Sequence, residues 1–61
     1  MAAEQGLHKA QYILGVILEF GLEVKTDLKK AEYWYKKSAE QGYKDAMEAL
    51  ERVRKARSQK E

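Results

Sequence analysis

The sequence predicts an all-α fold, and three observations support this class. The 61 residues contain no proline and are rich in Ala, Leu, Glu, Lys and Gln, whose side chains lose little rotamer freedom in a helix. Glycines at positions 6, 21 and 42 stand where a left-handed residue could end a helix. Between them, apolar residues recur at spacings of three and four. We therefore expect a single domain, residues 1–61, with helices at about 8–20, 27–41 and 44–57.

Each expected helix has a stripe of residues that can be buried. In the first helix the stripe is Ala10, Ile13, Leu14, Ile17 and Leu18. The second helix begins near Asp27, whose carboxylate can accept hydrogen bonds from free backbone N–H groups, with Thr26 as a competing cap. The stripe of the second helix is Leu28, Ala31, Trp34, Tyr35, Ser38 and Ala39, and that of the third is Ala46, Met47, Leu50 and Val53. Surface pairs are expected between Glu32 and Lys36, Glu48 and Arg52, and Glu51 and Lys55.

The sequence also repeats itself with an offset of 36 residues. When residues 2–17 are laid on residues 38–53, six of sixteen positions are identical. A period in the thirties built from two helices is typical of an α-solenoid, in which each helix pair buries its apolar face against its neighbours. The fold class is therefore a three-helix piece of an α-solenoid, with about one and a half 36-residue repeats. Residues 3–42 form one complete repeat, and residues 43–61 form the first helix of a second repeat, which acts as a C-terminal cap.

The complete repeat resembles the Sel-one-like repeat family, a relative of the tetratricopeptide repeats. The matching positions are Gly6, Ala10, Gln11, Leu14, Gly15, Gly21, Val24, Asp27, Lys30, Ala31, Trp34, Tyr35, Lys37 and Ala39. The resemblance implies antiparallel helix pairs stacked into a right-handed superhelix. It also implies a role in holding protein complexes together rather than in catalysis.

Three departures have physical consequences. A tyrosine of the family pattern is Leu18 here, and the second loop glycine of the pattern is Glu23. A left-handed backbone at a non-glycine residue costs about 1 kcal/mol or more, so we expect a rebuilt loop. Gly15 allows two helices to approach closely, but its counterpart in the second repeat is Glu51. We expect nothing to pack on Glu51.

Composition and motifs argue against an enzyme. The formal charge is only +2 and there is no cysteine. No nucleophile has a base beside it in the sequence, and no glycine-rich phosphate loop is present. His8 stands alone, so it is interpreted as a surface histidine rather than a metal ligand. We expect no cofactor and no metal, and the lack of a signal peptide makes a soluble, cytoplasmic protein the default.

The preferred functional hypothesis is a protein-interaction module or scaffold. By resemblance to tetratricopeptide packing, one face of the first and third helices is the concave side, where a partner segment or helix could dock. The expected partner-binding residues are Lys9, Tyr12, Val16 and Glu19 with their third-helix counterparts Asp45, Glu48, Arg52 and Lys55. The alternative is that Tyr12 and Val16 are simply covered by neighbouring side chains.

Self-association is a second expectation. The apolar residues of the first helix run nearly all the way round it, as in a helix between two neighbours, but only the second helix is available in this chain. A homodimer, or an oligomer that exchanges helices through the loop at residues 21–25, would cover the remaining side. The residues expected at this contact are Tyr12, Ile13, Val16 and Phe20.

Two rival interpretations concern other ligands. The basic end, residues 52–60, could bind nucleic acid or another anionic surface. Its candidate residues are Arg52, Arg54, Lys55, Arg57 and Lys60. The helix dipole also favours cations at a helix C-terminus, and this would explain the basic residues without any ligand. The aromatic residues Tyr33, Trp34, Tyr35 and Tyr43 could stack on bases, but their helical spacing favours a core for Trp34 and Tyr35 and a half-exposed Tyr33.

Overall fold

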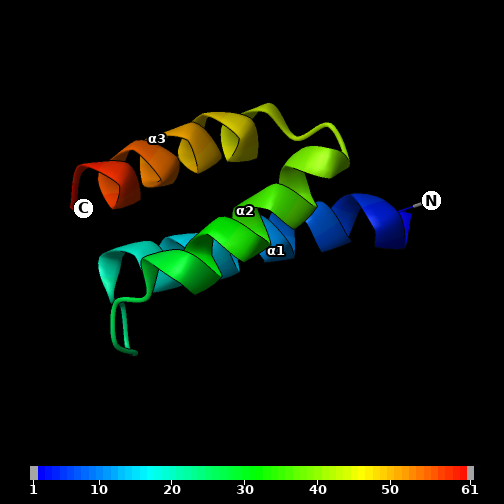
Figure 1. Ribbon diagram of the computed structural model, residues 1–61. Helices are drawn as coiled ribbons and strands as arrows, with labels where there is room; N and C mark the ends of the chain where they lie inside the picture. The colour runs from blue at the N-terminus through cyan, green and yellow to red at the C-terminus, as the bar shows by residue number, and fades with distance from the viewer. Residues whose placement is uncertain (1, 61) are drawn as a thin grey trace.

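The computed structural model describes the backbone of residues 2–60 and the side chains of residues 7–58. The described residues form three α-helices: α1 (Ala2–Phe20), α2 (Leu28–Glu40) and α3 (Lys44–Lys60). α2 packs against both other helices, whereas the backbones of α1 and α3 come close at few positions (Figure 1). The expected all-α class is confirmed.

The predicted helix ends are largely confirmed, with one error. The Asp27 carboxylate accepts a hydrogen bond from the backbone N–H of Lys30 at 3.1 Å, so Asp27 rather than Thr26 caps α2. Gly21 and Gly42 have φ values of +67° and +90°, the left-handed backbone expected after a helix. The expected break at Gly6 is wrong, because α1 runs through it from Ala2. A single glycine inside a helix costs only about 1 kcal/mol relative to alanine, which the remaining turns can sustain.

The buried core is small and lies mainly between α2 and α3. Ala31 and Tyr35 of α2 form one buried cluster with Ala49 and Val53 of α3, and Ala46 of α3 is also fully buried. Tyr12, Val16, Leu18, Leu28 and Leu50 pack against them and are partly buried. The prediction for α3 is wrong at Met47, which is 48% exposed because Ala49 takes the inward position.

The predicted buried stripe of α1 is wrong in most of its members. Ala10 is exposed, and Ile13 and Leu14 are 53% and 40% exposed. The side of α1 that faces α2 instead carries Gln11 and Gly15, both buried. Because α1 is apolar nearly all round, periodicity alone could not distinguish its inner side from its outer side.

Gly15 allows the close contact that the sequence predicted. A Cβ atom at this position would lie 2.5 Å from Cε1 of the buried Tyr35 ring. Nearby, the Ser38 hydroxyl donates to the carbonyl of His8 at 2.7 Å, and Gln41 donates through its side chain to the buried Gln11 at 2.8 Å. The bond from Ser38 of α2, the bond from Gln41 just after α2 and the close approach at Gly15 all help to hold α2 against α1.

The loop between α1 and α2 keeps the backbone that we expected it to lose. Glu23 has a φ of +66°, so the left-handed conformation persists without glycine and the expected rebuilding is wrong. Two backbone hydrogen bonds to the end of α1 hold this loop: Leu22 N–H donates to Ile17 at 3.0 Å, and Asp27 N–H donates to Leu18 at 2.9 Å. These bonds offset the local strain at Glu23.

Candidate functional site

The candidate site is the surface that α1 and α3 share beside α2, here called the α1–α3 surface. It is defined by Lys9, Tyr12, Val16, Glu19, Asp45, Glu48, Arg52 and Lys55. Although the backbones of α1 and α3 lie apart for most of their length, side chains link the two helices at both ends of this surface. Ionic hydrogen bonds form one link, and aromatic rings form the other.

The ionic link is centred on Glu19. Its carboxylate accepts hydrogen bonds from Arg52 Nε at 2.8 Å and from Arg52 Nη2 at 2.7 Å. The buried Tyr35 hydroxyl donates to the same carboxylate at 2.7 Å. One glutamate of α1 thereby joins α2 and α3, and Arg52 also lies over the Phe20 ring at 5.9 Å.

These contacts change the titration of all three groups. The Arg52 hydrogen bonds lower the pKa of Glu19 below its usual value, although partial burial opposes the change. Burial, followed by the bond to Glu19, raises the pKa of Tyr35 well above its ordinary value. The bond to Glu19 also raises the pKa of Arg52. The cluster therefore stays as carboxylate, phenol and guanidinium around neutral pH.

The aromatic link is formed by His8 and Tyr12 of α1 with Tyr43, which precedes α3. Ring centroids lie 4.7 Å apart for His8 and Tyr43 and 5.3 Å apart for Tyr12 and Tyr43. Tyr12 also lies 5.7 Å from the Tyr35 ring. Partial burial raises the pKa of Tyr43, and the nearby Asp45 carboxylate adds to this effect. Sequence reasoning missed this cluster because nothing local relates His8 to Tyr43.

The structure places the predicted partner-binding residues in two groups. Tyr12, Val16 and Glu19 are partly buried: the first two pack against the core, and the third is held by Arg52 and Tyr35. The exposed members are Lys9, Asp45, Glu48, Arg52 and Lys55. The surface is thus a half-buried aromatic and aliphatic strip with mixed charges along it, and its role in binding stays a prediction.

The predicted self-association set is divided between two sides of α1. Ile13 and Phe20 are 53% and 60% exposed, whereas Tyr12 and Val16 pack partly against the core. Only Ile13 and Phe20 therefore keep large exposed areas for contact with a second copy. Self-association itself stays a prediction.

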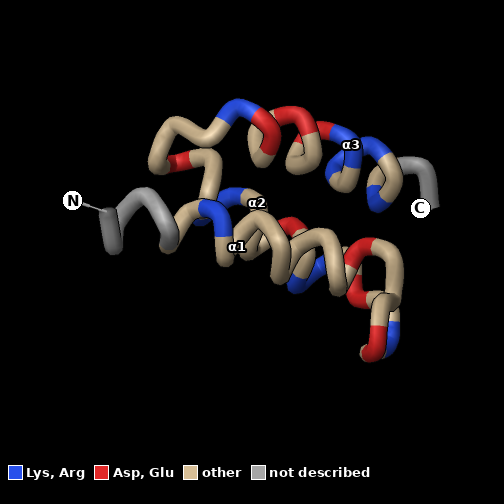
Figure 2. Tube along the Cα trace, turned by 180° about the vertical axis from the view of Figure 1, so that it is seen from behind, with Lys and Arg blue, Asp and Glu red and all other residues tan. Residues whose placement is uncertain are grey.

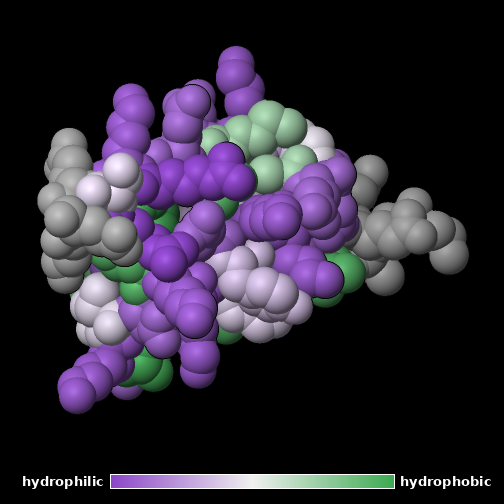
Figure 3. All heavy atoms as spheres, viewed as in Figure 1, coloured by the Kyte–Doolittle hydropathy of each residue, from purple (hydrophilic) through white to green (hydrophobic). Residues whose placement is uncertain are grey.

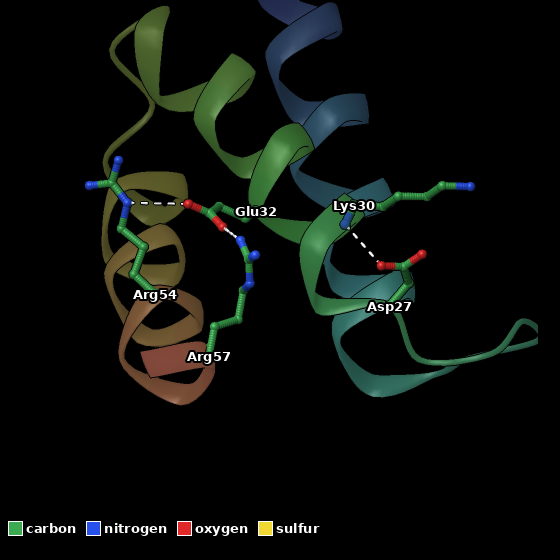
Figure 4. Close-up of polar contacts among 5 residues, drawn as sticks. All are labelled: Asp27, Lys30, Glu32, Arg54 and Arg57. Carbon is green, nitrogen blue, oxygen red and sulfur yellow. Dashed lines mark hydrogen bonds and ion pairs between the residues drawn. The ribbon is translucent and has the colours of Figure 1, made fainter. Parts of the chain in front are cut away.

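Several cationic side chains of the basic end are paired with carboxylates within the fold, so fewer of them can contact an anionic ligand than the sequence indicated. Arg52 is held by Glu19, while Arg54 and Arg57 both contact Glu32 of α2, the former at 3.4 Å (Figure 4). Glu32 therefore pairs with arginines of α3 in place of Lys36, and Arg52 pairs with Glu19 in place of Glu48. Lys55 is exposed, and the side chain of Lys60 lies outside the described residues. Pairing within the fold leaves the anionic-surface alternative without structural support.

The remaining candidates show little that points to chemistry. Tyr35 is fully buried and Tyr33 is 51% exposed, as their spacing predicted. Lys37 lies 5.5 Å from the Tyr33 ring centroid, beside a shallow hollow that Lys36 and Glu40 also line. Within the described side chains, no three His, Cys, Asp or Glu residues are grouped to hold a metal ion. Among the described helices, none has the length and apolar character needed to cross a membrane.

Comparison with known proteins identifies the repeat. The sequence pattern described as "Sel1 repeat" matches residues 8–43, more than half of the chain. The chain belongs to the Sel1 repeat family. This result confirms the resemblance on which the helical-repeat interpretation rested.

Two curated relatives are regulators of chitin synthase by name. Over 50 residues the chain is 44% identical to "Chitin synthase regulatory factor 3" of Schizosaccharomyces pombe, covering 82% of this chain and 5% of the relative. Over 41 residues it is 46% identical to "Chitin synthase regulator SKT5" of Malassezia restricta, covering 67% of this chain and 3% of the relative. The chain therefore spans about one twentieth or less of these relatives. No solved structure matches the chain.

The family and the names of these relatives point to a protein-interaction repeat module.

Proposed function

We propose that this repeat binds a segment of a partner protein on the α1–α3 surface. The observation that carries the proposal is that two helices whose backbones come close at few positions are bridged by side chains at both ends of one surface. The Glu19–Arg52 pair forms one bridge, and the contact of Tyr12 with Tyr43 forms the other. The bridges fix the relative positions of α1 and α3, so a partner meets a preorganised surface and loses less binding free energy to ordering.

The chemistry of the surface indicates what such a partner offers. Tyr12 and Val16 are half-buried, so they present limited apolar area that an apolar or aromatic side chain can cover. Lys9 and Glu48 are exposed and opposite in charge. Rim charges of this kind select and orient a partner more than they add affinity. A peptide with one apolar anchor flanked by charges of both signs fits this description.

The proposal can be tested with binders selected from a displayed library of random peptides. Changing Tyr12 or Val16 would disturb the core, so the informative variant reverses two exposed charges, Lys9→Glu with Glu48→Lys. We expect binders selected on the parent chain to lose about tenfold in affinity for this variant, in line with 1.4 kcal/mol for a tenfold change. The matched control reverses an exposed pair of opposite charges on α2, Lys29→Glu with Glu40→Lys, which also keeps the net charge, and should leave binding unchanged.

Circular dichroism must show that both variants keep their helices. Equal loss in the variant and the control, or no loss in either, would show that binding takes place elsewhere.

A further inference from the structure

The side of α2 that is turned away from both other helices is cationic, with an aromatic residue at its centre. We define the α2 outer face by its exposed residues, Lys29, Lys30, Tyr33, Lys36, Lys37 and Glu40. In the view of Figure 3, where α2 lies in front of α1, hydrophilic residues cover most of the surface. Four lysines and one glutamate give this face a net charge of +3, larger than the +2 of the whole chain.

Helical geometry places the lysines in two rows, one on either side of Tyr33. Successive residues of a helix are about 100° apart, so Lys29 and Lys36 lie about 40–60° to one side of Tyr33. Lys30 and Lys37 lie about 40–60° to the other side. The fully buried residues of α2 are on the opposite side of the helix, about 140–160° from Tyr33. Two rows of cations thus flank one ring that is 51% exposed.

The lysines of this face form no ion pair with a carboxylate in the part of the chain whose side chains are described. Glu32 was the expected local partner of Lys36, but it contacts Arg54 and Arg57 of α3 instead. Figure 2 shows positive and negative residues interspersed along α3, so charges there can compensate each other. On the α2 outer face only Glu40 has the opposite sign. The interhelical pairing of Glu32 therefore leaves a positive surface on α2.

A shallow hollow on this face has room for one side chain of a partner. It has a volume of about 210 Å³ and is lined by Tyr33, Lys36, Lys37 and Glu40. Sites that hold a whole small molecule are usually larger, about 300–1,000 Å³. Nζ of Lys37 lies 5.5 Å from the centroid of the Tyr33 ring. An apolar or aromatic side chain in the hollow can pack against this ring while its neighbours in the partner reach the lysines.

We infer that the α2 outer face binds an acidic segment of a partner protein, whose carboxylates contact the lysines while one apolar side chain packs against Tyr33. The face is about 17 Å long from Lys29 to Glu40, which an extended segment of about five residues can cover. Complementary charge steers such a segment to the face and orients it more than it adds affinity. The inference does not rest on the α1–α3 surface, where binding depends on Lys9 and Glu48 and is tested separately.

A nucleic acid is a poorer fit to this face than an acidic protein segment. Arginine, rather than lysine, offers the planar fork that matches phosphate groups. The arginines Arg52, Arg54 and Arg57 are all held by carboxylates of the fold. Glu40 would also repel a backbone that carries a negative charge at each phosphate. A protein segment can place a neutral residue opposite Glu40 and keep its carboxylates opposite the lysines.

The test uses two capped synthetic peptides. The acidic peptide has one phenylalanine between two pairs of acidic residues, and the neutral peptide has asparagine and glutamine in place of the acidic residues. Each is titrated at low ionic strength into the isotopically labelled 61-residue chain and followed by NMR. We expect the acidic peptide to shift the amide signals of Tyr33, Lys36 and Lys37 and to bind less tightly as salt is added. The neutral peptide should bind about tenfold more weakly.

A variant that removes two charges from the face locates the binding site. Lys36→Gln with Lys37→Gln should weaken binding of the acidic peptide about fivefold, because two exposed ion pairs are lost. Glutamine and lysine have similar helix propensities, so the variant keeps the helix. The matched control removes two exposed lysines outside the face, Lys25→Gln with Lys44→Gln, and should bind the peptide normally. Equal losses in the variant and the control would mean diffuse attraction without a site and would overturn the inference.

Tyr33→Ala tests the aromatic contact and should also weaken binding about fivefold. Its control is Met47→Ala, which removes an exposed apolar side chain of α3 and should leave binding unchanged. A neutral peptide that binds as tightly as the acidic one would overturn the inference, as would absence of binding at millimolar peptide. Tighter binding of a short oligothymidylate, with shifts at the same residues, would assign the face to nucleic acid and would overturn it too.

Discussion

Replacing Gly15 by alanine tests the closest interhelical approach in the fold. The added Cβ atom would lie 2.5 Å from Cε1, 2.6 Å from Cδ1 and 3.0 Å from Cζ of Tyr35. Ordinary carbon–carbon contacts are about 3.5–4.0 Å, so the overlap is about 1 Å. The ring cannot easily move aside, because Tyr35 is fully buried and its hydroxyl is bonded to Glu19.

The net effect follows from two opposing contributions. Overpacking a tight contact costs about 1–3 kcal/mol, and a 1 Å overlap with a fixed ring favours the upper end of that range. Alanine gains about 1 kcal/mol in helix propensity over glycine. We therefore expect Gly15→Ala to lower the free energy of unfolding by about 2 kcal/mol, which for a domain of this size lowers Tm by about 10 °C.

Thermal and urea unfolding, followed by circular dichroism, measures this change. Glu51 provides the internal control, because it occupies the equivalent repeat position and is exposed. The difference in stability between Glu51→Ala and Glu51→Gly gives the propensity contribution in the same fold. In a Tyr35→Leu background, which removes two of the three overlapping ring atoms, most of the cost of Gly15→Ala should disappear. A Gly15→Ala chain as stable as the parent would refute the packing argument.

Three further predictions concern single sites. Asp27→Ala removes the α2 cap bond to Lys30 and should cost about 1 kcal/mol in urea unfolding; an unchanged midpoint would mean that another group caps α2. Glu23→Gly relieves a left-handed backbone and should stabilise the fold by about 0.5 kcal/mol, because the loss of strain slightly exceeds the entropy that glycine adds to the unfolded chain. The Arg52 hydrogen bonds lower the pKa of Glu19, so their stabilisation is present above the ordinary value of 4.5 and is lost as pH falls through the lowered pKa. A pH series of unfolding midpoints should show this acid loss in the parent and a weaker one in Glu19→Gln; identical profiles would argue against it.

Local signals account for the parts of the fold that were predicted correctly. A carboxylate at the start of a helical pattern satisfies backbone N–H groups wherever the helix packs, so Asp27 could be assigned from sequence. Gly21 and Gly42 likewise end their helices by a local backbone preference. By the same reasoning Gly6 was misassigned, because a glycine permits a helix end without requiring one.

The candidate surface was only partly predictable. Helical spacing grouped Tyr12, Val16 and Glu19 on one side of α1, and the structure keeps them together. Helical spacing did not identify the partners of these residues, because Arg52 and Tyr43 are far away in the sequence. Glu32 was expected to pair with Lys36, four residues further along α2. Instead, it contacts the guanidinium groups of Arg54 and Arg57 where α2 packs against α3.

The sequence by itself determined three helices, a 36-residue repeat and the need for one very close contact at Gly15. These features depend on local backbone preferences and on the spacing of apolar residues, which the chain carries without reference to its neighbours. Only the tertiary structure decided which side of α1 is buried. The outer side, with Ile13 and Ile17, is the more apolar one, but the inner side has Gly15 and leaves room for the Tyr35 ring. Burial follows the side that permits close packing, and a periodic pattern does not encode that choice.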